Sequence, residues 1–491
     1  MADIVNDALA SAPLPKKNGY DDGPPQALLD FMVTQWATPS GNVAPIDALA
    51  HFRARRAALS ARFPNETLIV ASGHEKVRAN DTTYRFRPGT DFYYLTGNHE
   101  ADCVLVLSPR SGGGHDDVLY VEPNPGKNDA TFFTDRVKGE LWVGPRLGVP
   151  ESEIRFGLAT RSLAALLDDV RVLNREDAAR PFRLLRGVDL QLDAMLPAQS
   201  DRDNAFAAAL SEMRLIKDDF EILELQKAID ATQRGFEDVV RSLPHARTER
   251  HVEGVFNLRA RVEGNDVGYN TIAASGRHAC ILHWTSNDGD LCTNDLLLLD
   301  AGVEAHTLYT ADITRTIPIS GAFTKEQREI YEMVYAAQEA GFAECAPGND
   351  FMAPNVAAMR VLAHGLERLG ILPTSAEEAL REHNQFYKRY SLHNVSHMLG
   401  LDVHDCAQAR AQTYKFGKLE AGMVLTVEPG LYLQPDDLTV PKKYRGIGVR
   451  IEDDVLITAS GHRVMSEALP REFVAVERWM RALWASGAAE R

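Results

Sequence analysis

Four carboxylates in this chain stand beside apolar, β-rich runs, where a charged side chain is hard to explain. Asp300 ends the run LLLLD, and Asp312 opens the run DITRTIPI. Glu428 follows MVLTV, and Glu452 lies within YRGIGVRIEDDVLIT. A carboxylate at the edge of a core is costly to desolvate and needs a partner. Because neighbouring carboxylates repel one another, a metal ion is an economical partner, although an aspartate can also cap a turn and a strand-end glutamate can face water.

Histidines supply a second signal. His393, His397 and His404 stand close together in SLHNVSHMLGLDVHDC, in a chain with 15 histidines in all. A single histidine on an apolar face is usually a satisfied core residue, whereas three so close together indicate a metal site or a site of proton transfer. Gly400 within the same segment argues against a long helix here.

The number of charges indicates how many ions such a site would hold. The four carboxylates carry about four negative charges, which two divalent cations balance if some carboxylates bridge both ions. Oxygen ligands with a single imidazole suit manganese, cobalt or iron better than a thiolate-rich structural zinc site. Two ions ~3.5–4 Å apart can hold a bridging hydroxide and polarise a carbonyl. The residues therefore favour metal-assisted hydrolysis.

The first half of the chain predicts a domain that carries no such residues. From Thr67 to about Asp201, short β-rich runs alternate with helical patterns, which predicts a small α/β domain. We expect strands at TLIVAS, DFYYLTG, CVLVLS and VLYVEP, and a helix at TRSLAALLDD. A helix from Ala48 to Arg62 precedes them, and its cluster of Arg53, Arg55 and Arg56 is typical of an exposed helix face.

The second half must position the candidate ligands. Residues 206–243 have apolar residues at three- and four-residue spacings, which predicts one or two amphipathic helices that open a second domain. Helices and strands then mix without regular βαβ alternation, so we expect an α+β fold. Helices are expected at QREIYEMVYAAQEAGFAE and VAAMRVLAHGLERLG, and strands at LLLLDAG, ITRTIPI, MVLTVEPGLYL and GVRIEDDVLIT.

Composition excludes several classes of function. The chain has 491 residues and a formal net charge of −16, which argues against broad nucleic-acid binding. No apolar run approaches the ~20 residues of a membrane span, and the N-terminus lacks the pattern of a signal peptide. Five cysteines form no CxxC pair. We therefore expect no nucleic-acid or membrane partner, and a cytoplasmic location.

The four segments LLLLDAG…ADITRT, LHNVSHMLGLDVHD, VEPGLY and GIGVRIEDD, in this order, resemble the creatinase/aminopeptidase family of pita-bread metallopeptidases (M24B). The upstream segment RANDTTYRFRPGTDFYYLTGNHEADCVLVL is similar to the N-terminal domain of aminopeptidase P. The resemblance covers about residues 50 to 480. It implies an α/β N-terminal domain followed by an α+β pita-bread catalytic domain, and hydrolysis of the bond between an N-terminal residue and a following proline by a metal-bridging hydroxide.

The resemblance also implies a role for individual residues. Asp300 would bind one ion, His397 and Glu428 the other, and Asp312 and Glu452 would bridge both. The ions would be two divalent cations, manganese first, with cobalt, iron or zinc as the other candidates. Glu428 would also take part in proton transfer. The remaining expected site residues, which would line the cleft, contact substrate or hold the ligands, are His283, His393, His404, Tyr432 and Arg450.

Two positions depart from the family's pattern. The interval from Asp300 to Asp312 (312 − 300 = 12) is one residue longer than expected, and a shift of register there would turn Asp312 away from the site. We place the extra residue in a turn around Ala305–Thr307 or in a bulge. Asn394 stands where the family often has glycine.

The resemblance gives an expected organisation and leaves three alternatives open. We expect an extension over residues 1–48, the N-terminal domain over 49–205, the catalytic domain over 206–482 and a tail over 483–491. Partners would be peptides with proline in second position and further copies of the chain, as a dimer or tetramer. The alternatives are a strict Xaa-Pro dipeptidase, a pita-bread binding protein without catalysis, and a metal-free creatine amidinohydrolase.

Overall fold

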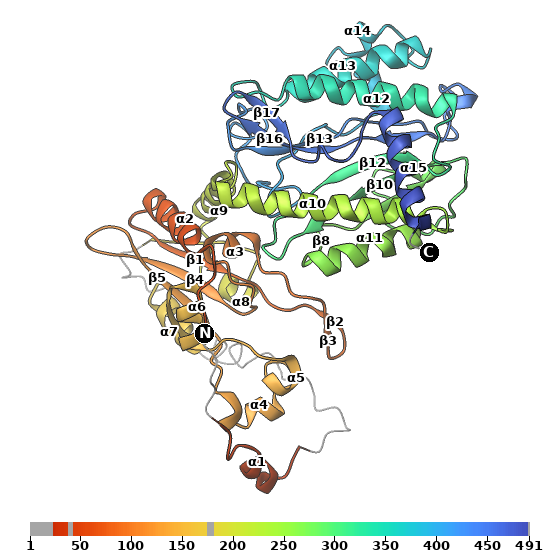
Figure 1. Cartoon of the computed structure of the whole chain (residues 1–491). Coiled ribbons are helices and arrows are strands. Elements are labelled where there is room, and N and C mark those ends of the chain that lie inside the picture. The colour runs from red at the N-terminus through yellow and green to blue at the C-terminus, as the bar shows by residue number, and fades with distance from the viewer. Residues whose placement is uncertain (1–22, 38–42, 174–180, 490–491) are drawn as a thin grey trace.

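The computed structural model describes residues 23–37, 43–173 and 181–489. It shows two bodies in sequence order, the N-terminal one in red to yellow and the C-terminal one in green to blue (Figure 1). Most of the expected 1–48 extension lies outside the described residues. Its described part contains helix α1 (Gln26–Met32), none of whose residues is buried.

The N-terminal body is built on a mixed five-stranded sheet of order β6-β5-β4-β1-β7. The β1–β4 and β4–β5 pairs are antiparallel. Each edge strand is parallel to its neighbour, β6 to β5 and β7 to β1. Alternate side chains enter two separate hydrophobic clusters, one on each face of the sheet. The strands are β1 (Thr67–Ala71), β4 (Val104–Pro109), β5 (His115–Val121), β6 (Ala159–Ser162) and β7 (Phe182–Leu184).

Helices cover this sheet, and one of them corrects a prediction. The predicted strand DFYYLTG (residues 91–97) instead falls in helix α3 (Thr90–Thr96) and its C-cap Gly97, which has a left-handed φ of 69°. Its run of aromatic residues is buried on several sides, so packing overrides β propensity. The other helices are α2 (Leu49–Arg62), α4 (Thr131–Thr134), α5 (Glu140–Val143), α6 (Val149–Phe156), α7 (Leu163–Leu173) and α8 (Leu190–Met195), and a hairpin of β2 (Val77–Ala79) and β3 (Thr82–Thr83) extends from the body.

The arginines of α2 correct a second prediction. Of the three clustered arginines, Arg53 is exposed, whereas Arg55 and Arg56 are buried. Arg56 donates to Asp117 and to the Leu95 carbonyl. Arg55 forms ion pairs with Asp218 and Glu221 of the C-terminal body. Buried guanidinium groups need such partners, and the local sequence does not reveal them.

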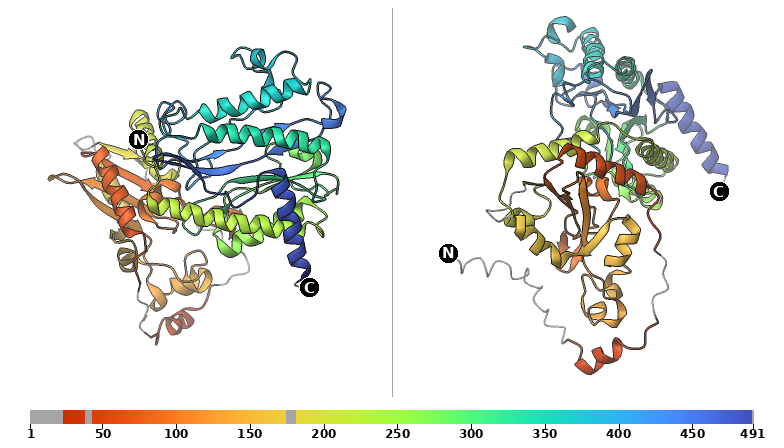
Figure 2. Two further views of the ribbon diagram at one scale, coloured as in Figure 1. Left: turned by 45° about the horizontal axis from the view of Figure 1, so that its top comes forward. Right: turned by 90° about the vertical axis from the view of Figure 1, so that its left-hand side faces the viewer.

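The C-terminal body places its strands between two pairs of helices (Figure 1, and in another orientation Figure 2). Helices α12 and α13 lie on one side, and α10 and α11 lie on the other. The expected amphipathic stretch over 206–243 is two helices, of which α10 begins at a capping box formed by Asp218 and Glu221. The helices are α9 (Ser200–Met213), α10 (Asp219–Ser242), α11 (Glu249–Glu263), α12 (Lys325–Ala343), α13 (Ala353–Arg368), α14 (Ala376–Ala379) and α15 (Phe473–Ala489).

Two antiparallel sheets, of orders β12-β10-β9 and β13-β16-β17, form the centre of this body. The Glu452 N–H donates to the Thr314 carbonyl and so joins the strand ends of the two sheets. The predicted strands are all present, although MVLTVEPGLYL and GVRIEDDVLIT each divide in two. The strands are β8 (Asp266–Val267), β9 (Ile272–Ser275), β10 (Leu296–Ala301), β11 (Val303–Glu304), β12 (Ile313–Pro318), β13 (Val424–Val427), β14 (Gly430–Tyr432), β15 (Gly448–Arg450), β16 (Asp453–Thr458) and β17 (Gly461–Val464).

Three further observations concern the whole chain. The five cysteines are free. Among the helices that the structure describes, none is long and apolar enough to cross a membrane. The expected domain limits at 205 and 482 fall inside α9 and α15, so these limits stay predictions.

Candidate metal centre

The strand ends of the two central sheets bring the predicted ligands together. Asp312, His397 and Glu452 each offer a ligand atom, and these atoms all lie within 4.8 Å of one another. His397 Nε2 is 3.3 Å from Asp312 Oδ2 and 3.6 Å from Glu428 Oε1. Residues that are distant in sequence thus converge because β10 and β13 end, and β12 and β16 begin, at one place.

The register of Asp312 is compatible with a ligand role. Asp300 pairs with Thr314 across β10 and β12, and the hairpin between them closes with a turn at Ala305–Leu308, where Leu308 has a left-handed φ of 64°. Asp312 still faces the cluster. The longer interval between Asp300 and Asp312 therefore does not shift the register of Asp312 away from the cluster.

Tyr269 joins two of the carboxylates, and the sequence did not single it out. Its hydroxyl lies 2.6 Å from Asp300 Oδ1 and 2.5 Å from Asp312 Oδ1. The two carboxylates compete for its single proton, and burial raises the pKa of Tyr269 far above its usual range. No local pattern marks it, because Tyr269 stands in a short irregular segment after β8 and reaches the cluster only in the folded chain.

Arg450 is a buried cation that faces the cluster. It pairs with Asp300, donates from Nη1 to Tyr432 OH at 2.9 Å, and donates from Nε to Thr314 Oγ1 at 3.1 Å. Thr314 in turn donates to Glu452 Oε2 at 2.6 Å. These bonds fix the carboxylate oxygens and leave their remaining lone pairs available.

The electrostatics of the cluster fit divalent cations. Burial raises the pKa of Glu452 well above its usual range, and repulsion from Asp312 raises it further. Burial also raises the pKa of Glu428 to about 7. Asp454 Oδ1, close behind, is buried without a hydrogen-bond partner among the described residues. One guanidinium cannot balance so many buried carboxylates, and hard oxygen donors with one imidazole are ligands that a divalent ion accepts. The alternative that Glu452 faces water at a strand end is wrong, since Glu452 is 2% exposed.

The histidines fall into two groups. His397 lies inside the cluster; burial opposes its charge, but the hydrogen bond to Asp312 and the charge of Glu428 raise its pKa to about 9. His393 and His404 are different, because burial lowers the pKa of His393 to about 4 and also lowers that of His404. Both are therefore neutral at pH 7 and can each donate one N–H.

Each of the other predicted histidines has a distinct place. His393 contacts Tyr432 OH through Nε2 at 2.8 Å and stands 3.5 Å from Glu428 through Nδ1. The ring of His404 lies with its centroid 4.3 Å from that of His397. His283 is exposed and lies outside this hydrogen-bonded network, although its charge acts on both His393 and His404.

Comparison with known proteins places this geometry in a family. A model described as metallopeptidase family M24 matches residues 224–459, and the model of the aminopeptidase P N-terminal domain matches residues 52–177. Xaa-Pro aminopeptidase 1 of Streptomyces coelicolor is 50% identical over 473 residues, which cover 95% of this chain and 94% of that protein. The chain belongs to metallopeptidase family M24.

Further M24 relatives extend the likeness to solved structures. The Xaa-Pro aminopeptidase of Escherichia coli is 33% identical over 451 residues, covering 88% of this chain and 97% of that one. The structure of aminopeptidase P from E. coli in its low-pH form matches with a TM-score of 0.79 and 32% identity, over 89% of this chain and 98% of that one. The expected fold, an α/β N-terminal domain with an α+β pita-bread domain, is confirmed.

Membership of the M24 metallopeptidases implies a site for divalent metal ions in this chain. The buried cluster of carboxylates and His397 has the composition that such a site requires. Its position between the two central sheets also explains why the ligands come from four separate segments of the sequence.

Proposed function

We propose that this chain is a metallo-aminopeptidase that hydrolyses the bond between an N-terminal residue and a following proline, and that five residues hold its two divalent ions. The observation that carries the proposal is the cluster of Asp312, His397 and Glu452, with Glu428 beside His397 and Asp300 joined to Asp312 through Tyr269. The chain also matches relatives named Xaa-Pro aminopeptidase over nearly their full length. The proposed ligands are Asp300, Asp312, His397, Glu428 and Glu452.

The chemistry divides between the ions and the chain. When bound, the ions supply an activated water at neutral pH and polarise the scissile carbonyl. The chain supplies proton acceptors and donors around that place. Glu428 is the proposed acceptor of the water's proton, since it stands at the edge of the cluster beside His393 and His397.

The neutral histidines are proposed to act as hydrogen-bond donors. His404 is exposed beside His397, so its N–H can reach the carbonyl oxygen of a peptide as that oxygen gains negative charge. His393 is tied to Arg450 through the hydroxyl of Tyr432. These two hydrogen bonds hold the His393 ring in place. The carboxylates around the ring attract the free ammonium of the substrate. His283 or Glu428 would return a proton to the proline nitrogen.

Proline explains why a dedicated site is useful. Its nitrogen carries no N–H and its φ is fixed, so a peptide with proline in second position binds poorly to clefts that bind substrates as an added strand. An enzyme that holds the free amine and the proline ring avoids this requirement.

Manganese is the proposed native metal, because oxygen ligands with one imidazole suit it. We also propose a homo-oligomer, dimer or tetramer; helix α5 exposes Leu141, Trp142 and Val143, each to more than half, which supports a surface that another copy covers. A cytoplasmic location is proposed from the five free cysteines. Light scattering after size-exclusion chromatography would measure the oligomeric state.

Comparing two substrates separates the main proposal from its closest alternative. A strict dipeptidase cleaves Gly-Pro but spares a longer Xaa-Pro-Yaa-Zaa peptide, whereas the proposed enzyme releases the first residue from the longer peptide. Mass spectrometry of the products identifies the bond cleaved. Cleavage of the dipeptide alone would contradict the proposal, and failure to bind any divalent ion would favour a binding protein.

A further inference from the structure

Two carboxylates, Asp402 and Asp405, flank His404 in sequence. Both accept hydrogen bonds from side chains that lie outside the sheets of the C-terminal body. Asp402 Oδ1 accepts from the Thr90 hydroxyl at 2.6 Å and from Arg87 at 3.3 Å. Asp405 Oδ1 accepts from Arg214 Nε at 2.9 Å. The loop that carries His404 is thus anchored two residues before and one residue after the histidine.

His404 itself has little else to hold it. Its ring is exposed and, within the part of the chain that the structure describes, forms no side-chain hydrogen bond; its close ring contact is with His397. The position of the ring therefore depends on the backbone of its loop. The loop leaves no room for a side chain at Gly400, where an added Cβ would lie 2.1 Å from Asp405 Oδ2.

Arg87 connects this loop to a second strand of the site. One guanidinium nitrogen donates to the Leu401 carbonyl at 2.6 Å, and Nε donates to Glu304 Oε2 at 2.6 Å. Glu304 belongs to β11, the hairpin that leads into Asp312. A single side chain of the N-terminal body thus contacts both segments that enter the metal centre from this side.

A buried chain of charges continues the contact. Asp91, in the first turn of α3, pairs with Arg214, which pairs with Asp405, and Lys217 Nζ lies 3.5 Å from Asp405 Oδ2. Burial opposes the charge of Asp405, but Arg214 and Lys217 lower its pKa below the usual range. Asp405 is therefore a fixed anion between two fixed cations, and Asp91 extends the chain to the N-terminal body.

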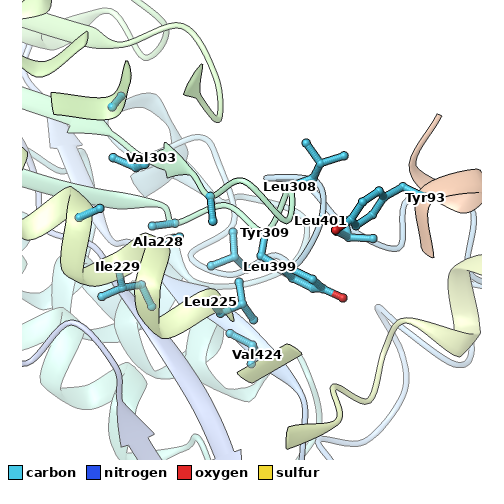
Figure 3. Close-up of a cluster of buried hydrophobic side chains, with 14 of the residues drawn as sticks. Tyr93, Leu225, Ala228, Ile229, Val303, Leu308, Tyr309, Leu399, Leu401 and Val424 are labelled. Carbon is cyan, nitrogen blue, oxygen red and sulfur yellow. The ribbon is translucent and has the colours of Figure 1, made fainter. Parts of the chain in front are cut away.

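Apolar packing joins the same elements. Tyr93 of α3 points toward Leu401 and Leu308 in Figure 3, and all three side chains are buried in one cluster that runs on to Val424 of β13. A displacement of α3 would have to move the segment that begins at Leu401. Polar and apolar contacts therefore act in the same direction.

We propose that Thr90, with Arg87 and Asp91, is a positioning group of the active site: the first turn of α3 and the residues before it hold the loop of Asp402 and Asp405 so that His404 faces the metal centre. The N-terminal body thereby completes the site. This inference rests on the proposed aminopeptidase function.

Kinetics of Thr90→Val test the inference most sharply, since valine keeps the shape and removes the hydroxyl. With an Xaa-Pro-Yaa peptide, we expect kcat to fall about tenfold with KM nearly unchanged, as for a small misplacement of a group that acts in the transition state. Thr90→Ser keeps the hydroxyl and should restore activity. Thr96→Val is the matched control, since its hydroxyl donates to Phe92 O within α3, and it should leave kcat unchanged.

A double-mutant cycle with His404→Ala distinguishes positioning from loss of stability. If Thr90 acts through His404, Thr90→Val should cause no further loss of kcat in the His404→Ala background. Equal losses of kcat in both backgrounds would overturn the inference, as would a kcat of Thr90→Val equal to that of wild type.

Hydrogen exchange gives a readout that needs no turnover. In Thr90→Val, amides of residues 399–406 should exchange about tenfold faster than in wild type, while those of β13 keep their rate. Unchanged exchange of 399–406 would overturn the inference. A wild-type protein that binds metal but cleaves no Xaa-Pro peptide would contradict the proposed function, and the exchange result would still decide whether residues 87–91 hold the loop.

Discussion

Glu249 supports the loop that carries His283, and its replacement by glutamine tests how the site is held from behind. The carboxylate is 0% exposed, at the start of α11. It accepts four hydrogen bonds of 2.7–2.8 Å, from the N–H groups of Ser275 and Gly289 and from the rings of His278 and Trp284. These donors lie on both sides of His283 in sequence, so one carboxylate closes the loop.

The size of the effect follows from which oxygen each donor uses. Oε1 accepts from Ser275 and His278, and Oε2 accepts from Gly289 and Trp284. Glutamine keeps one acceptor oxygen, so two donors lose their partner in either orientation. Since a hydrogen bond to a charged group contributes about 1.5–3 kcal/mol, Glu249→Gln should lower the free energy of unfolding by about 3–6 kcal/mol. For a domain of the size of the C-terminal body, the thermal midpoint of unfolding should fall by on the order of 10 °C.

Differential scanning calorimetry at one pH and scan rate measures this change. Glu253→Gln, one turn further along α11, is the matched control and should leave the midpoint within about 1 °C. Because the His283 loop loses its anchor, the kcat of Glu249→Gln should fall as well. A midpoint within about 2 °C of wild type would refute the reasoning, since it would mean that the two lost bonds contribute almost nothing.

Three further predictions concern two candidate ligands, the uptake of metal and a histidine of the N-terminal body. Glu428→Gln and Asp312→Asn should each lower kcat by at least about a thousandfold without lowering the thermal midpoint of the metal-free protein, because each removes a repelling buried charge; circular dichroism and turnover measure both effects, and activity within about tenfold of wild type would contradict the ligand roles. Metal uptake should release at least about one proton near pH 7, because the pKa of Glu428 is raised to about 7 and that of His397 to about 9; affinity should therefore rise with pH, and calorimetry in buffers of different ionisation enthalpy gives the proton count. Hydrogen bonds to Asp102 and Asp189 raise the pKa of His74 to about 10, so its contribution to stability is full below pH 6.5 and is lost as the pH rises through about 10; because His74 is partly exposed, the contribution is at most about 1 kcal/mol, and His74→Gln should remove this slope from urea unfolding measured between pH 7 and pH 10.

The cluster of candidate ligands was predictable because its residues violate a local rule. Asp300 and Glu428 place charges where apolar strands demand none, and such conflicts between local pattern and residue type mark functional sites. Strands of the C-terminal body were predictable for the opposite reason, since their long and bounded apolar runs follow the local rule. The charge count then required cations that the segment around Asp300 and Asp312 does not contain.

What the sequence could not reveal depends on contacts between distant segments. The segment DFYYLTG (residues 91–97) was predicted as a strand because aromatic residues favour strands, but the burial of these residues on several sides of a short helix overrides that preference. Arg55 and Arg56 read as exposed, because their partners stand far away along the chain. Tyr269 stands in an irregular segment where no periodicity marks a residue. In each case the deciding contact forms only after the chain has folded.

Hydrolysis of an Xaa-Pro-Yaa peptide by metal-stripped protein, with manganese, cobalt and zinc added back separately, tests the central claim most directly. The stripped protein should be inactive, and manganese should restore release of the first residue from the wild type but not from Glu428→Gln. A stripped protein that keeps full activity, or a wild type that no divalent ion activates, would contradict the account.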